Sequence, residues 1–143
     1  MSAEENKTVI RRVFLEAMNG NQPELYEGLI AQDYVNHDLP APVPGIEGFK
    51  IVDGMFKAAF PDFQIVLEDE IAEGDLVATR GYFTGTHRGE FMGIPATGKT
   101  VKTPYIDVWR LENGKGRENW VQMDMLGLLQ QLGAIPRPEQ TAA

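Results

Sequence analysis

The apolar residues in the first part of the chain recur at the three- and four-residue spacing of amphipathic helices. Ser2 and Glu5 form a capping-box pattern, and the helical spacing that follows stops at Asn19, so a first helix is predicted between them. Pro23 suits the first turn of a helix, and a second, shorter helix is predicted from there until Asp33. The two helices should form a helical hairpin.

Prolines then interrupt the helical pattern. Pro40, Pro42 and Pro44 lie within residues 38–45, and because proline cannot continue a helix or a central strand, this segment is predicted to be an extended crossover. Helical spacing returns at residues 46–60, which predict a third helix. Its apolar side carries Phe49, Val52, Phe56 and Ala59.

From residue 63 onward the apolar period changes to two, which is the period of strands. Helices first and antiparallel strands afterwards favour an α+β fold, in which three N-terminal helices pack on a strongly curved antiparallel sheet and enclose a hydrophobic pocket. The predicted strands are residues 63–71, 76–86, 101–111 and 117–126.

Two segments lie outside this helix-and-strand pattern. Residues 85–99 form a loop rich in glycine, and its apolar residues Phe91 and Met92 suggest that it covers the pocket. Residues 126–132 predict a short terminal helix. We therefore expect a single domain over residues 1–135 and a flexible tail at 136–143.

Composition and charge exclude several classes of protein. The 143 residues are 43% hydrophobic, which suits a globular domain, and their formal net charge of −8 opposes a nucleic-acid partner or an anionic membrane surface. The chain has no cysteine, so it has no disulfide or thiolate zinc site. Its N-terminal residues carry charges and resemble neither a signal peptide nor a membrane span. A cytoplasmic protein is expected.

The last hairpin can be divided into two faces. If Asn113-Gly114 is a two-residue turn, Glu112 pairs with Lys115 and Asp107 with Trp120, and directly opposed residues share a face. One extra residue in the loop would place the pocket-face residues of each strand opposite the outer-face residues of the other strand. The predicted pocket face then carries Tyr105, Asp107, Trp109, Glu118, Trp120, Gln122 and Asp124, while the outer face carries Ile106, Val108, Arg110, Val121, Met123 and Met125. Because the outer face is mostly aliphatic, it predicts a homodimer or a higher homo-oligomer.

Asp124, His87 and His37 each allow a functional role and a structural one. Asp124 near aromatic side chains would be partly desolvated, which raises the pKa of a carboxyl group and makes it usable as a general acid or base. It precedes an apolar helix, however, and could equally serve as that helix's N-cap. His87 could polarise a carbonyl group or be an ordinary loop residue, and His37 could lie at the pocket mouth or in a turn.

No residue pattern has the close spacing of a known metal-ligand motif, so no metal site is predicted. Residues 93–100 end superficially like a phosphate-binding loop. Gly93, Gly98, Lys99 and Thr100 have the spacing of that loop, but Pro95 removes a backbone N–H that a phosphate would need, and residues 98–100 are predicted to be a turn that enters a strand rather than a helix. Nucleotide binding is therefore not expected.

The order of motifs along the chain resembles the SnoaL-like polyketide cyclase family. The resemblance covers about residues 5 to 135, nearly the whole chain, and is more specific for the family than for any one reaction. The motifs that carry it are Tyr34-Val35-Asn36-His37, Phe60-Pro61-Asp62, residues 85–99, Asn113-Gly114-Lys115, Glu118-Asn119-Trp120, and Asp124-Met125-Leu126-Gly127 through Gln131-Leu132-Gly133.

The resemblance implies a cone-shaped α+β barrel of the nuclear-transport-factor-two-like superfamily. It also implies an aspartate that acts as the acid/base in an intramolecular aldol closure of a polyketide ester, without metal or cofactor. By its Asp-x-x-Gly context, Asp124 matches that aspartate, and His87 matches a histidine of the loop motif. The cyclases carry Gln-x-His where this chain has Tyr105-Ile106-Asp107, and a carboxylate there would disfavour a nearby enolate unless it is protonated.

The expected function is thus cofactor-independent acid/base chemistry on a hydrophobic carbonyl compound, either an aldol cyclisation or a related isomerisation, dehydration or hydrolysis. The alternative is a small-molecule-binding protein of the same fold that catalyses nothing. Catalytic candidates are Asp124, His87 and Asp107, and expected substrate contacts are Tyr105, Trp109, Trp120, Gln122, Phe91, Met92, His37, Phe14 and Phe56.

Overall fold

The computed structural model describes residues 1–136 and begins with the predicted amphipathic helix. Helix α1 (Ala3–Arg12) continues directly into a π-helical segment, η1 (Val13–Met18). The capping box is present, since the Glu5 amide donates to Ser2 Oγ at 3.1 Å and the Ser2 amide donates to Glu5 Oε1 at 3.0 Å. The local sequence signal therefore sets where the first helix starts.

The second predicted helix is correct at its start and too long at its end. A short 3₁₀ segment, η2 (Pro23–Leu25), leads into α2 (Tyr26–Leu29), but the chain then becomes strand β1 (Ile30–Asn36). Backbone pairing of Ile30 with Gly116 and of Val35 with Glu118 favours the extended conformation over a further helical turn. β1 was not predicted, because it pairs with a strand more than eighty residues away.

The proline segment and the third helix agree with the prediction. Helix α3 (Gly45–Ala59) begins at Gly45, whose φ of 74° suits glycine, and the segment before it is irregular. Asn36 Oδ1 accepts hydrogen bonds from the backbone amides of Asp38 at 2.9 Å and Leu39 at 2.7 Å. The segment between β1 and α3 is thus tied down at its first residues.

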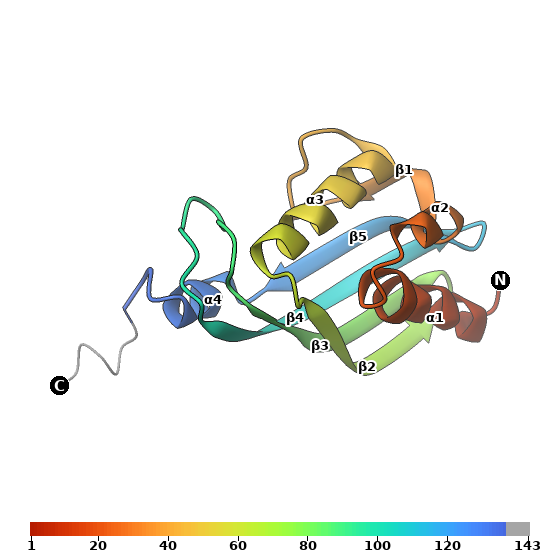
Figure 1. Cartoon of the computed structure of the whole chain (residues 1–143). Coiled ribbons are helices and arrows are strands. Elements are labelled where there is room, and N and C mark those ends of the chain that lie inside the picture. The colour runs from red at the N-terminus through yellow and green to blue at the C-terminus, as the bar shows by residue number, and fades with distance from the viewer. Residues whose placement is uncertain (137–143) are drawn as a thin grey trace.

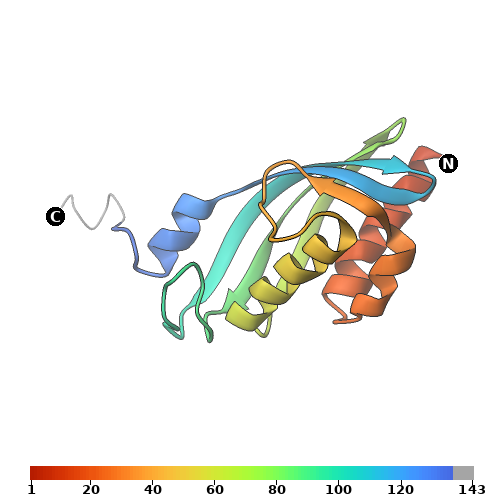
Figure 2. The same ribbon diagram turned by 90° about the horizontal axis from the view of Figure 1, so that it is seen from above.

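One mixed sheet forms the other layer of the fold. Strands β2 (Gln64–Glu73), β3 (Leu76–Thr86), β4 (Thr100–Glu112) and β5 (Lys115–Met123) are antiparallel neighbours, and β1 runs parallel to β5 at one edge in the order β1-β5-β4-β3-β2. Helices α1 to α3 cover one face of this sheet (Figures 1 and 2). The α+β class is confirmed, but the sheet is mixed and open rather than an entirely antiparallel barrel.

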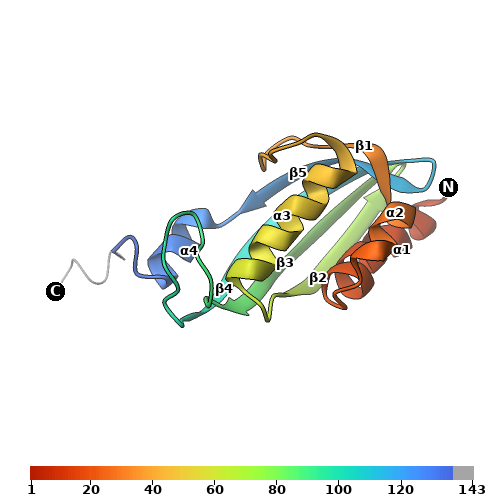
Figure 3. The same cartoon turned by 45° about the horizontal axis from the view of Figure 1, so that its top comes forward.

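The far end of the molecule carries the predicted terminal helix. Helix α4 (Met125–Gln131) lies beyond the end of β5, beside the loop between β3 and β4 (Figure 3). Most of the predicted tail, residues 137–143, lies outside the described residues. No helix within residues 1–136 is long and apolar enough to cross a membrane.

The register of the last hairpin shifts within β5, and the predicted faces of that strand are wrong. Glu112 pairs with Lys115 and Leu111 with Gly116 as expected, but the next pair is Arg110 with Glu118, so Arg117 is an extra residue. Each later residue of β5 therefore turns to the opposite face from the one predicted. Asn119, Val121 and Met123 share the helix-covered face with Trp109, Asp107 and Tyr105, while Glu118, Trp120 and Gln122 lie on the outer face.

Candidate functional site

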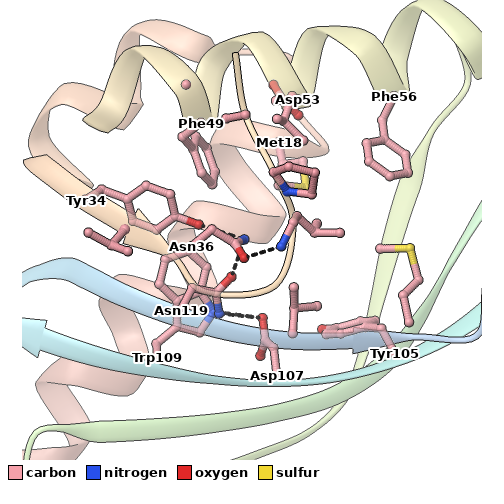
Figure 4. A pocket seen from close by; sticks show the side chains of 18 of the residues that line it. Met18, Tyr34, Asn36, Phe49, Asp53, Phe56, Tyr105, Asp107, Trp109 and Asn119 are labelled. Atoms are coloured by element: carbon pink, nitrogen blue, oxygen red, sulfur yellow. Dashed lines mark hydrogen bonds between the residues drawn. The ribbon is translucent and has the colours of Figure 1, made fainter. Parts of the chain in front are cut away.

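A cavity of about 420 Å³ lies between helix α3, the proline segment and the helix-covered face of the sheet (Figure 4). Its wall is mainly apolar, as expected for a site that binds a hydrophobic small molecule. Only a few of the lining residues contribute polar side chains. They are Asp107, Asn119, Tyr105, Tyr34, Asn36 and Asp53.

Asp107 is the most buried carboxyl group at this cavity, with 4% of its surface exposed. It accepts hydrogen bonds from Thr79 Oγ1 at 2.5 Å, from Trp109 Nε1 at 2.9 Å and from Asn119 Nδ2 at 3.4 Å. Burial raises the pKa of Asp107 to about 6, although the hydrogen bonds act in the opposite direction. The carboxyl group can therefore exchange a proton near neutral pH.

Tyr105 continues this network on the same strand. Its hydroxyl oxygen lies 3.1 Å from Thr79 Oγ1. Because Thr79 has one hydroxyl proton and donates it to Asp107, Tyr105 must be the donor to Thr79. Burial raises the pKa of the Tyr105 phenol, so this hydroxyl stays protonated. The result is a chain of donors that ends on the Asp107 carboxylate.

A second chain of polar groups connects Asp107 with the start of the proline segment. Asn36 Nδ2 lies 3.4 Å from Asn119 Oδ1 and donates to the Tyr34 hydroxyl oxygen at 3.1 Å. Within residues 1–136, the Tyr34 hydroxyl proton has no acceptor. Burial raises the pKa of Tyr34, which keeps this proton in place. Tyr34 therefore offers a free hydrogen-bond donor at the cavity wall (Figure 4).

Five of the residues expected at the pocket line the cavity. They come from η1, α3 and β4, three elements whose inward faces the apolar pattern placed correctly. These five residues are Phe14, Phe56, Tyr105, Asp107 and Trp109.

Four others lie on the outer face of the sheet or extend from it, and this corrects the prediction. The extra residue at Arg117 moves each later side chain of β5 to the opposite face of the sheet. Trp120, Gln122 and Glu118 therefore point away from the cavity. The ring of His37 stacks on that of Trp120 with centroids 4.7 Å apart, and its Nε2 lies 3.1 Å from Glu118 Oε1. His37 therefore belongs to a cluster outside the cavity.

The loop between β3 and β4 packs beside the cavity without lining it. His87 is fully buried, and its Nδ1 accepts a hydrogen bond from the Thr97 backbone amide at 3.2 Å, which holds the two ends of the loop together. Phe91 packs against Phe56 and Phe60. Met92 is 68% exposed. None of these loop residues belongs to the cavity wall.

Asp124 also lies outside the cavity wall. It is exposed and caps helix α4, since its Oδ1 accepts a hydrogen bond from the Gly127 amide at 2.9 Å. Of the two roles that the sequence left open, the capping contact is the one present in the structure. Within the described residues, no group of three or more His, Asp or Glu side chains could hold a metal ion.

Comparison with known proteins identifies the family. The sequence profile described as SnoaL-like polyketide cyclase matches residues 8–132. The chain belongs to this family. It is 31% identical to the aklanonic acid methyl ester cyclase DnrD of Streptomyces peucetius, over 92% of this chain and 93% of that protein. DauD of Streptomyces sp. strain C5, also named an aklanonic acid methyl ester cyclase, is 30% identical over 92% of this chain and 84% of that protein.

Solved structures share the fold of this SnoaL-like chain. TsrD from Streptomyces laurentii superposes with a TM-score of 0.87 at 28% identity, over 94% of this chain and 99% of that chain. The resemblance seen in the sequence motifs is thus confirmed for the family and for the fold.

Sequence reasoning missed several polar residues at the cavity of this SnoaL-like chain. Asn119 was hidden by the register shift, and Tyr34 and Asn36 by the missed strand β1. Asp53 had a usable signal, because it stands four residues after Phe49 and three before Phe56, within the apolar stripe of α3. A carboxylate at such a position often has a specific partner or ligand.

Proposed function

We propose that this protein is a cofactor-independent cyclase that closes a ring in a polycyclic polyketide ester, with Asp107 as the acid/base. The observation that carries the proposal is the placement of Asp107, a buried carboxyl group with a pKa of about 6, in the wall of a mainly apolar cavity. The names of DnrD and DauD supply the substrate class, a polyketide methyl ester. An intramolecular aldol reaction requires a proton transfer in each direction, and a carboxyl group with this pKa can perform both.

The reaction starts with the Asp107 carboxylate removing a proton from the carbon next to a substrate carbonyl. The resulting enolate carbon attacks a second carbonyl carbon of the same molecule, which forms the new carbon–carbon bond and leaves an alkoxide. Asp107 returns the proton to that alkoxide oxygen. The product is an isomer of the substrate, so the reaction balances without another reactant.

The carboxylate at position 107 is compatible with an enolate in this scheme. When Asp107 takes the proton it becomes neutral, so no like charge faces the enolate while the enolate exists. In this scheme the free hydroxyl proton of Tyr34, which lines the same cavity, donates to the enolate oxygen. The donors from Thr79, Trp109 and Asn119 keep the carboxyl group in one orientation throughout.

Turnover of aklanonic acid methyl ester by Asp107→Asn tests the proposal. The amide has nearly the shape of the carboxylate but cannot act as the base, so kcat should fall by at least about 100-fold. Asp124→Asn is the matched control, because Asn remains a good N-cap, and its turnover should equal that of the unchanged protein. Loss of turnover in Asp124→Asn with full activity in Asp107→Asn would refute the assignment.

The second candidate is a protein of the same fold that binds a polyketide-like ligand without converting it. It is favoured by the three protein donors that already occupy Asp107, as they would in a carboxyl group with a purely structural role. Under this alternative the unchanged protein binds the ester and forms no product. Chromatography of the incubated ester separates the two candidates.

A further inference from the structure

Asp53 is a second carboxyl group at the cavity, and the scheme above does not use it. It lies on α3, on the opposite side of the cavity from the β4 residue Asp107 (Figure 4). Only 8% of its side chain is exposed. The cavity is thus bordered by one carboxyl group on the sheet and another on the helix.

The protein satisfies only one oxygen of the Asp53 carboxylate. The Tyr26 hydroxyl donates to Asp53 Oδ2 at 3.1 Å, and Lys57 Nζ lies 3.2 Å from the same oxygen. Among the described residues, no group donates to Oδ1, and this oxygen is not fully buried. A carboxylate can accept about four hydrogen bonds, so Asp53 keeps free acceptor capacity.

A purely structural role explains the position of Asp53 poorly. A pair of Asp and Lys four residues apart stabilises a helix equally well on its exposed side, where neither group is desolvated. Asp53 instead stands between Phe49 and Phe56, and burial raises its pKa despite the Lys57 cation. The cost of burial is therefore not fully offset by protein partners.

We propose that Asp53 is a ligand-recognition residue, whose Oδ1 accepts a hydrogen bond from a hydroxyl group of the molecule bound in the cavity. A neutral donor fits better than a cation, because Lys57 already balances the charge of Asp53. The ligand class is then a polycyclic ketone that carries a hydroxyl group on its side facing α3. This inference rests on the proposed function only for the polycyclic nature of the ligand.

Binding of two matched probes tests the inference without any need for turnover. The probes are 2-(hydroxymethyl)anthraquinone and 2-ethylanthraquinone, tricyclic ketones of nearly equal size of which only the first has a hydroxyl group. Quenching of Trp109 fluorescence reports binding, because this indole lines the cavity, and Trp120→Phe removes the other tryptophan signal. The measured quantity is the ratio of the two dissociation constants.

With Asp53 present, the protein should prefer the hydroxylated probe. Asp53→Leu should reduce this preference, measured as the ratio of the two dissociation constants, by about 10-fold or more. Affinity for 2-ethylanthraquinone should stay within about threefold. Asp53→Asn retains a partner for Tyr26 and should lower the ratio by a smaller factor, so it serves if the leucine variant does not fold. Asp33→Leu, at an exposed aspartate, is the control and should leave the ratio unchanged.

An equal ratio in the protein with Asp53 and in both Asp53 variants would overturn the inference, as would failure of the protein to bind either probe. These outcomes are distinct from failure of the proposed function. If both probes bind with the expected ratio but aklanonic acid methyl ester is not converted, recognition by Asp53 stands and the cyclase proposal fails.

Discussion

The buried Asp107 carboxyl group makes a prediction about stability that does not require a substrate. Its pKa is about 6 in the folded protein and close to 3.8 in the unfolded chain, so the folded state binds the proton more tightly. The stabilisation from this proton is fully present below about pH 3.8 and is lost as the pH rises through 6. The difference between the two values corresponds to about 3 kcal/mol at neutral pH.

Asp107→Asn removes this dependence and can keep the hydrogen bonds. The amide oxygen can accept from Trp109 Nε1 and Asn119 Nδ2, while the amide NH₂ donates to Thr79 Oγ1. Thr79 then donates to the Tyr105 hydroxyl oxygen, which reverses one link of the chain and leaves the Tyr105 proton without Thr79 as its acceptor. At pH 7.5 the variant should therefore be more stable than the unchanged protein by up to about 3 kcal/mol.

Urea denaturation followed by circular dichroism measures this difference at pH 4.5, 5.5, 6.5 and 7.5. The free energy of unfolding of Asp107→Asn minus that of the unchanged protein should rise with pH and level off above 7. Other buried acids such as Asp53 and Glu70 are present in both proteins, so their contributions cancel in the difference. A difference that stays constant over this range would show that Asp107 has no raised pKa and would remove the basis for its acid/base role.

Two further predictions concern the hairpin. A Cβ atom at Gly116 would lie 2.9 Å from Cε3 and Cζ3 of Trp109. Gly116→Ala should therefore lower the free energy of unfolding by about 1–3 kcal/mol in the same urea assay. An unchanged urea midpoint would contradict this packing. The register shift leaves the outer face of the sheet less aliphatic than predicted, since Glu118 and Gln122 replace Val121 and Met123 there. We still propose that this face forms a homodimer, through Ile106 and Trp120, which are 57% and 38% exposed; Ile106→Lys should convert a dimer into a monomer in sedimentation experiments, whereas a persistent dimer would argue against this face.

Much of the fold follows from signals that act over a few residues. The capping box at Ser2, the prolines at 40, 42 and 44, and the turn at Asn113-Gly114 each fix the backbone locally, and each prediction is confirmed. Asn113 and Gly114 both have positive φ values, 52° and 75°, as a tight two-residue hairpin turn requires. Such features can be predicted because their causes lie next to them in the sequence.

The errors arise where distant residues decide the structure. Strand β1 is stabilised by parallel pairing with β5, and no local sequence pattern around Ile30 indicates that it pairs with Gly116. The bulge at Arg117 is non-local too, because Gly116 leaves room for the Trp109 indole on the neighbouring strand. A glycine inside a strand is a known sign of a bulge, and Gly116, which lies just before the predicted strand at residues 117–126, was the available warning.

That single extra residue also decides the chemistry of the cavity. In the unshifted register, Asp107 would face Trp120 and share its surface with Glu118. In the structure it faces Val121, and its neighbours are hydrogen-bond donors rather than a second acid on the same strand pair. The pKa of Asp107 is therefore set by burial against those donors, which places it near neutrality. A carboxyl group with that pKa can both accept and return one proton, as an aldol closure demands.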